Sequence, residues 1–78
     1  MKRKQIFDEE GVKKFAKRLK KVRKDRGFTQ EELAYKSGLA LSQVARIETA
    51  RINPTISTVF KIAKTLEVEV KVLFDFSD

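Results

Sequence analysis

The sequence has 78 residues, neither cysteine nor histidine, and a formal net charge of +7. Such a length suits one small domain, and the missing cysteine and histidine exclude disulfides, thiolate metal sites and the usual general base. Because there is no phosphate-binding glycine loop and no long apolar run, we expect no enzyme, no cofactor, no metal site and no membrane-spanning segment. The opening residues, MKRKQIFDEE, lack the apolar stretch of a signal peptide, which predicts a cytoplasmic protein.

The charge is unevenly distributed along the chain. Residues 1–26 contain twelve Lys and Arg against four acids, residues 27–64 five against three, and residues 65–78 one against four. The net charges are therefore +8, +2 and −3, which sum to +7. A basic first third favours polyanions, above all nucleic acid, with an anionic membrane surface as the competitor. A solvated lysine-rich helix has the same composition, so the charge alone does not identify a partner.

The first predicted helix begins at Val12, because residues 1–10 have no clear apolar period. From there apolar side chains recur at the three- and four-residue spacing of a helix with one buried face. They are Val12, Phe15, Ala16, Leu19 and Val22. Lysines and arginines occupy the other faces. Gly27 suits the end of this helix, since glycine adopts a left-handed conformation at little cost.

A second and a third helix are predicted over residues 30–37 and 41–49. Thr29 is a good N-cap for the second helix, and Glu32, three residues later, completes a capping box. Gly38 can close this helix in a left-handed conformation. In the third helix the predicted buried residues are Val44 and Ile47.

The segment Asn53-Pro54-Thr55 predicts the start of a fourth helix, since proline disfavours helix in the residue before it and Thr55 can cap the helix. Its predicted buried face consists of Ile56, Val59, Ile62, Ala63 and Leu66. The following VEVKV, residues 68–72, alternates like a strand. At helical spacing, however, Val70, Leu73 and Phe74 form a short amphipathic turn. We favour the turn, because a lone strand has no obvious partner.

Three positions in residues 30–47 have a joint explanation. Two helices that cross steeply need a small residue where their axes approach, and Ala34 is small. Gly38, four residues later, provides the positive φ of a tight turn, and Val44, ten residues after Ala34, anchors the next helix. Each feature alone is common, but together they are typical of a helix-turn-helix.

The chain resembles the Cro/C1-type (Xre-family) helix-turn-helix DNA-binding proteins. The matching segments are FTQEELAYKSGL, VARIE, NPTISTVFKIAKTLEV and the closing LF. The resemblance implies an all-α, compact, five-helix, lambda-repressor-like domain over residues 12–74, with tails at 1–11 and 75–78. It also implies a sequence-specific transcriptional regulator, with a repressor favoured, that acts at the nucleoid as a homodimer on a palindromic operator in double-stranded DNA. The helix over residues 41–49 would enter the major groove.

The resemblance implies a set of DNA-binding residues: Gln30, Leu41, Ser42, Gln43, Arg46, Thr49 and Arg51. Gln30 would hold a phosphate at a helix N-terminus, and Arg51 would contact another phosphate. Arg46 is the favoured base reader, because a guanidinium can bond guanine O6 and N7 together. Leu41 has two interpretations that stay open, contact with a thymine methyl group or a place in the core.

The resemblance further implies a salt bridge between Arg23 and Glu48, joining the first and third helices. It also implies a dimer interface on the last two helices, formed by Phe60, Val70, Leu73 and Phe74. The alternative is that these four residues only close the core of the monomer.

Three alanines depart from the family pattern. Ala40 stands where a Ser or Thr usually caps the third helix, which removes about 1 kcal/mol of capping. Ala50 stands where a glycine usually ends that helix, so a strained or different exit is expected. Ala45 replaces a common serine and removes a polar contact. The base preference therefore cannot be carried over from the family.

Two alternative functions remain open at this point. The protein could be the antitoxin of a toxin–antitoxin module or the controller of a restriction–modification operon. A toxin would dock on residues 1–10 or the acidic end, through Phe7, Phe60 or Phe76. The second alternative is a protein-interaction module that does not bind DNA, which a weak salt dependence would reveal.

Overall fold

Four α-helices and a short 3-10 helix make up the structure, a computed structural model that describes residues 7–77. The elements are α1 (Glu9–Asp25), α2 (Gln30–Ser37), α3 (Leu41–Glu48), α4 (Ile56–Leu66) and η1 (Val70–Phe74). The fifth helix implied by the resemblance is thus one 3-10 turn and not an α-helix. The preference for a turn over a strand is confirmed, and residues 7–77 contain no strand. Three valines in residues 68–72 disfavour a longer helix.

The first helix starts earlier than predicted. Asp8 is its N-cap, and its Oδ1 accepts a hydrogen bond of 2.9 Å from the backbone N–H of Gly11. Glu9 and Glu10 lie in the first turn, where the helix dipole favours acids. The expected tail over residues 1–11 was therefore wrong for residues 9–11, because the cap acts one turn before the apolar period begins. Residues 1–6 lie outside the described residues.

The caps predicted for the other helices are confirmed. Thr29 and Glu32 form the reciprocal capping box of α2, and Gly38 closes that helix at φ 78°. Thr55 caps α4 by accepting from the backbone N–H of Thr58 at 3.2 Å. α3 ends at Glu48 and not at Thr49, which is its C-cap.

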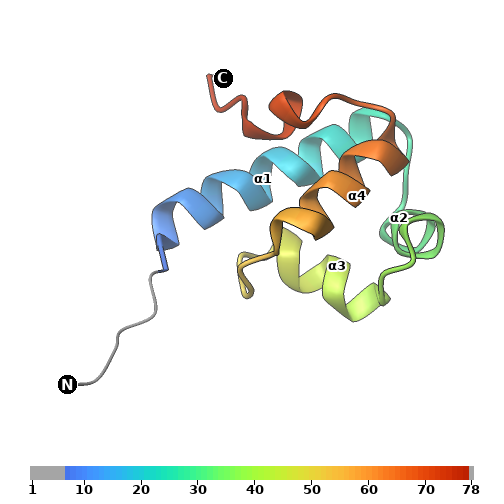
Figure 1. The fold of residues 1–78 in the computed structure, drawn as a ribbon, viewed down its shortest axis with the longest axis horizontal. Coiled ribbons are helices and arrows are strands. Elements are labelled where there is room, and N and C mark those ends of the chain that lie inside the picture. Colours follow the sequence, from blue (N-terminus) through green and yellow to red (C-terminus); the bar gives the residue numbers. More distant parts are fainter. Residues whose placement is uncertain (1–6, 78) are drawn as a thin grey trace.

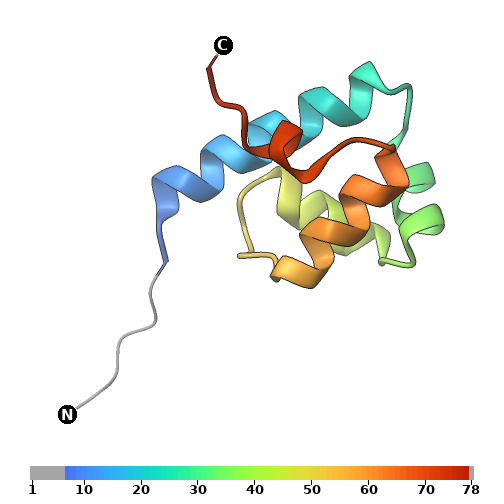
Figure 2. The ribbon, with the colours of Figure 1, turned by 45° about the horizontal axis from the view of Figure 1, so that its top comes forward.

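The core lies between α1, α4 and the pair of short helices α2 and α3, with η1 closing one side (Figures 1 and 2). Its fully buried side chains come from every element: Leu19, Leu33, Val44, Ile47, Ile62, Leu66 and Leu73. Ile56 was predicted to face inward but is 66% exposed, since it is the first residue of α4 and lies beyond the core. The structure therefore confirms the rest of the α4 stripe and corrects its first member.

The exit of α3 is strained at Ala50. This residue has φ 60°, a left-handed conformation that costs a residue with a Cβ about 1–2 kcal/mol. The start of α3 lacks a side-chain cap at Ala40, as expected. α3 thus lacks a side-chain cap at its start and has a strained residue just after its end, so its position depends strongly on its buried face.

We expect Ala50→Gly to stabilise the protein by about 1 kcal/mol, because glycine relieves the strain although it loses more backbone entropy on folding. The melting temperature should rise by about 4–8 °C in a domain of this size. The matched control is Gly38→Ala, which introduces a Cβ at φ 78° and should lower the melting temperature. A lower melting temperature for Ala50→Gly would contradict the strain at this position.

Candidate nucleic-acid interface

α2 and α3 form a helix-turn-helix at one side of the molecule. Figure 1 shows α2 nearly end-on and α3 running across the view, so the two helices cross steeply. Ala34 is buried, and the backbone N–H of Leu39 donates to the Ala34 carbonyl at 3.0 Å across the turn. The left-handed Gly38 and the buried Val44 thus have the roles that their spacing predicts, and the burial of the small Ala34 agrees with its predicted role.

The outer face of α3 is polar and open to solvent. Ser42 and Arg46 are exposed, Leu41 is 46% exposed, and Gln43 is half-buried. Because Leu41 is 46% exposed, the interpretation of this residue as part of the core was wrong. No hydrogen bond or ion pair joins the Arg46 guanidinium to any residue of 7–77, so its donors point to solvent.

Two further residues of the predicted set lie just beyond α3. Arg51 is exposed, and its guanidinium has no hydrogen bond or ion pair within the described part of the chain. Thr49 is exposed, but its hydroxyl donates to the Ala45 carbonyl at 2.9 Å. The donor of the Thr49 hydroxyl therefore serves its own helix, and its oxygen can still accept a hydrogen bond.

A buried network fixes α3 to α1 and α2. The structure contains the expected salt bridge: Arg23 Nε lies 2.6 Å from Glu48 Oε2, and Arg23 Nη2 lies 3.0 Å from Glu48 Oε1. The two side chains are only 7% and 1% exposed. Arg23 Nη1 also donates to the Phe28 carbonyl at 2.7 Å. All buried side-chain polar atoms in residues 7–77 have a partner, so this network is fully satisfied.

Gln30 belongs to the same network, which the sequence did not predict. Its Nε2 donates to Glu48 Oε1 at 3.0 Å, and the residue is half-buried at the N-terminus of α2. Gln30, the predicted phosphate contact, is therefore held in place by Glu48 at the end of α3. A glutamine 18 positions before a glutamate has no recognisable pattern, since the contact arises only when α2 and α3 cross.

The capping box also lowers the pKa of Glu32. The backbone N–H of Thr29, then its hydroxyl, and to a smaller extent the Lys36 ammonium lower the pKa of this carboxyl. A lowered folded pKa stabilises the fold above the ordinary pKa, and this contribution is lost as the pH falls through the folded value. The capping box therefore supports the start of α2 above the ordinary carboxyl pKa and less in acid.

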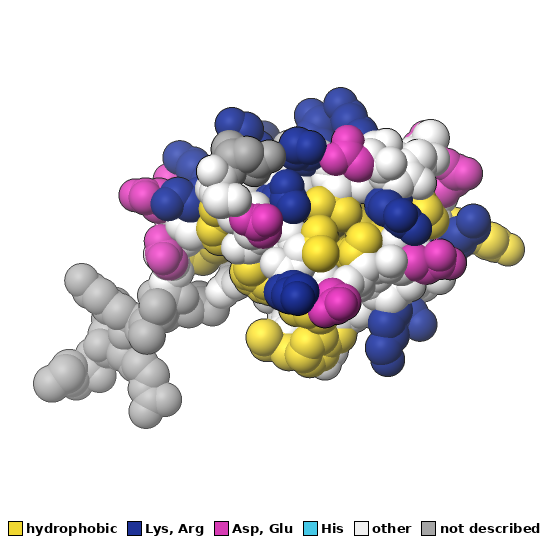
Figure 3. Space-filling view, turned by 90° about the horizontal axis from the view of Figure 1, so that it is seen from above, with side chains coloured by type: hydrophobic (Ala, Val, Ile, Leu, Met, Phe, Trp, Pro, Cys, Tyr) yellow, Lys and Arg dark blue, Asp and Glu magenta, His cyan; other side chains and the backbone are white. Residues whose placement is uncertain are grey.

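The predicted dimer residues do not all reach the surface. Phe60 and Phe74 are 48% and 47% exposed, and Val70 is half-buried. Leu73 is fully buried in the monomer, so its place in a dimer interface was wrong: this side of the amphipathic turn faces the core. Figure 3 looks onto the side that carries η1 and shows hydrophobic side chains gathered among charged ones. This side faces away from α3 (Figure 1).

Within residues 7–77, no group of three or more acids lies close enough together to hold a metal ion. Nor does any helix of that range have the length and apolarity to cross a membrane.

These features define a helix-turn-helix protein with an exposed second helix. A family model described as helix-turn-helix matches residues 19–73. The chain belongs to this family, in its Cro/C1 (Xre) type.

Individual relatives agree with this assignment. The chain is 41% identical over 56 residues to the immunity repressor protein of Bacillus phage phi105, a match that spans 72% of this chain and 39% of the repressor. It is 38% identical over 55 residues to the antitoxin HipB of Escherichia coli (strain K12), spanning 70% and 62% of the two chains. The chain thus spans well under half of the phage repressor and somewhat less than two thirds of HipB.

Among solved structures, the restriction–modification controller protein C.AhdI from Aeromonas hydrophila is similar over most of this chain. Its TM-score is 0.79 at 36% sequence identity, with 81% of this chain and 96% of that chain covered. Most of this fold is therefore a known arrangement for a protein of this size.

Proposed function

We propose that the protein is a sequence-specific, double-stranded DNA-binding transcriptional regulator, and most simply a repressor, that places α3 in the major groove. The observation that carries this proposal is the outer face of α3, where exposed Leu41, Ser42 and Arg46 stand on a helix fixed by a buried network. An α-helix fits the major groove, and base edges there distinguish all four base pairs. The relatives' names, a repressor and a restriction–modification controller, support the same function.

The contacts divide into base reading and positioning. Arg46 reads a guanine through two parallel hydrogen bonds, because its guanidinium is exposed and has no hydrogen bond or ion pair with any of residues 7–77. Leu41 contacts a thymine methyl group, and Ser42 and Gln43 contribute polar contacts beside it. A second group, formed by Gln30, Thr49 and Arg51, contacts the phosphate backbone and fixes the register of α3.

The regulator acts as a homodimer. One α3 offers only a few base contacts, at about 1–3 kcal/mol each, which is too little to select one site in a genome. Two copies about one DNA turn apart on a palindromic site double that discrimination. The exposed Phe60 on α4, with the exposed Phe74 and the half-buried Val70 on η1, is the proposed contact between the copies, because these apolar side chains are not fully covered in the monomer.

The test is to select bound fragments from random duplex DNA and then to measure affinity for the selected site at several salt concentrations. Each phosphate neutralised by a Lys or Arg adds about −0.9 to the log–log slope. Arg51→Ala should therefore make the slope about two units less steep for a dimer, whereas its effect is the same on every sequence. Lys61→Ala on α4 is the charge-matched control and should leave the slope unchanged. Binding without salt dependence, or no selected sequence, would overturn the proposal in favour of a protein-interaction module.

A controller of a restriction–modification operon is the second candidate, favoured by the nearly complete match to C.AhdI. An antitoxin is the third, favoured by the match to HipB and by the exposed Phe7 and Phe76, which would receive a toxin. All three bind DNA, so the position of the selected site separates them. A site upstream of restriction and modification genes supports the controller, and a site beside a toxin gene supports the antitoxin.

A further inference from the structure

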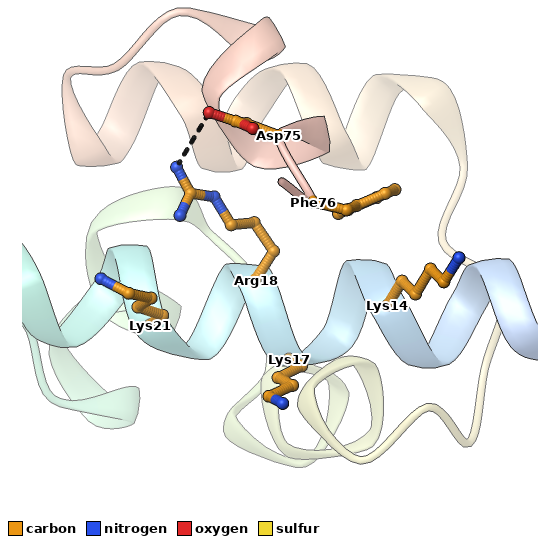
Figure 4. Close-up of a pocket in the computed structure, with 6 residues that line it drawn as sticks. All are labelled: Lys14, Lys17, Arg18, Lys21, Asp75 and Phe76. Carbon is orange, nitrogen blue, oxygen red and sulfur yellow. Dashed lines mark ion pairs between the residues drawn. The ribbon is translucent and has the colours of Figure 1, made fainter. Parts of the chain in front are cut away.

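A basic basin lies between α1 and the C-terminal residues, outside the helix-turn-helix. Its volume is about 390 Å³, and six residues line it: Lys14, Lys17, Arg18, Lys21, Asp75 and Phe76. Figure 4 shows Lys14 and Lys21 toward the two ends of this stretch of α1, with Asp75 and Phe76 on the side of η1. The volume falls in the range of small-molecule sites, about 300–1,000 Å³.

The basin faces away from the proposed DNA-binding surface. Arg18 directs its guanidinium to the C-terminal segment: its Nε donates to the Val72 carbonyl at 2.8 Å, and its Nη2 lies 3.9 Å from Asp75 Oδ2. Arg23, which reaches α3, is five residues further along and therefore points about 140° away around the helix. A ligand in the basin thus occupies a different side of α1 from the one that faces α3.

The lysines of the basin are available to a ligand. Lys17 has no hydrogen bond or ion pair with any residue of 7–77. Lys14 and Lys21 pair with Glu10 at 3.4 Å and Asp25 at 2.9 Å, and both pairs are exposed contacts within one helix. Such pairs are worth only a few tenths of a kcal/mol, so an anion of higher charge displaces them readily.

The same two acids limit the size of the ligand. Glu10 lies one turn before Lys14 and Asp25 one turn after Lys21, on the same face of α1, and Lys14 and Lys21 are about 10 Å apart along the axis. A long anionic strand that followed α1 would meet a carboxylate at each end. A compact polyanion fits between them.

The wall of the basin opposite α1, formed by Asp75 and Phe76, has a different chemistry. Phe76 is 40% exposed and packs edge-on against Phe74, with ring centroids 6.3 Å apart, so one face of its ring can receive another aromatic ring. Asp75 Oδ1 accepts hydrogen bonds from the Ser77 hydroxyl at 2.6 Å and the Ser77 backbone N–H at 3.2 Å. These bonds orient the carboxylate, whose Oδ2 lies 3.9 Å from Arg18 Nη2 and still has lone pairs to accept from a hydroxyl group.

Ammonium groups for phosphates, an aromatic ring for a base and a carboxylate for sugar hydroxyls are the three parts of a nucleotide site. We propose that this basin binds a nucleoside polyphosphate, with the phosphates on Lys14, Lys17 and Lys21, the base on Phe76 and the ribose on Asp75. The site makes the protein responsive to a soluble ligand through a surface that is separate from the DNA contacts.

Calorimetric titration of the full chain with ATP and, separately, with tripolyphosphate tests this proposal without magnesium. Tripolyphosphate carries at least as much charge as ATP, so about tenfold tighter binding of ATP is expected only if the base and ribose make contacts. Lys17→Ala should lower the affinity for both ligands about fivefold to tenfold. Lys24→Ala, an exposed lysine of α1 outside the basin, is the charge-matched control and should change neither affinity more than about twofold.

Two variants of the opposite wall distinguish a nucleotide site from plain charge. Phe76→Leu keeps an apolar side chain against Phe74. It should weaken the binding of ATP about tenfold and leave the affinity for tripolyphosphate unchanged. Asp75→Asn should weaken the binding of ATP, because the carboxylate acceptor for the ribose is lost. It should strengthen the binding of tripolyphosphate, because a negative charge is removed. Thermal melting of each variant verifies that it is folded.

The outcomes that overturn the proposal are equally specific. Equal affinities for ATP and tripolyphosphate, insensitive to Phe76→Leu, mean a simple cationic surface. Tighter binding of a single-stranded DNA octamer at the same lysines means a strand and not a compact ligand. Backbone amide shifts on adding ATP should fall on residues 14–21 and 75–77, and shifts confined to α3 would place the ligand on the DNA-binding surface instead.

Discussion

Glu48→Ala should destabilise the protein by about 3–5 kcal/mol, the largest effect expected of any single substitution considered. The change leaves the Arg23 guanidinium buried at 7% exposure without its carboxylate, and it removes the acceptor of Gln30 Nε2. A domain of this size has a total stability of about 4–12 kcal/mol, so the variant loses a large share of it. Urea unfolding at neutral pH, with the midpoint and slope compared with those of the parent protein, measures the loss.

The control for this prediction removes both charges. A double variant, Arg23→Met with Glu48→Leu, replaces the ion pair by apolar side chains of similar size and should recover most of the stability lost by Glu48→Ala. If Glu48→Ala unfolded at the same urea concentration as the parent protein, the network would not hold α3 to α1. Recovery in the double variant, with weaker DNA binding, would separate the role of Glu48 in stability from its support of Gln30.

Arg46→Ala should weaken binding to the selected operator by about 1–3 kcal/mol in each half-site, or about 5- to 150-fold per contact. Arg46 is exposed and has no partner within residues 7–77, so the fold loses nothing and the melting temperature should stay the same. Fluorescence anisotropy with the selected duplex, and with duplexes in which each guanine is changed in turn, measures both affinity and base preference.

The base preference is the decisive readout for Arg46. The parent protein should discriminate strongly at one guanine of each half-site, and Arg46→Ala should bind all four base pairs there with similar affinity. Arg51→Ala is the comparison, since a lost phosphate contact weakens binding on every duplex alike. An unchanged preference in Arg46→Ala would assign base reading to another residue of α3.

The local parts of the fold were predictable from short stretches of sequence. The capping box of Thr29 and Glu32, the left-handed Gly38 and the cap at Thr55 each depend on residues within four positions of one another. Their physics is local, so one sequence is enough to place them. The predicted start of α1 was wrong for a similar local reason: Asp8 caps the helix one turn before its apolar period begins.

Features that depend on tertiary packing were harder to predict. Leu73 and Phe74 are adjacent and both apolar, yet one is fully buried and the other about half exposed. Spacing alone does not decide which side of a short turn meets the core. The contact of Gln30 with Glu48 likewise exists only because α2 and α3 cross, whereas the exposure of Arg46 agrees with the position that the family resemblance gives it.

The division of α3 into a buried and an open side has an evolutionary consequence. Val44, Ile47 and Glu48 secure the helix, while Leu41, Ser42 and Arg46 add little to the stability of the monomer. The outward positions can accordingly be exchanged, singly or together, with small thermodynamic penalties, and the same scaffold can be redirected to new operators. A library randomised at those three positions should yield many folded proteins with altered targets, whereas one randomised at the inward positions should yield few.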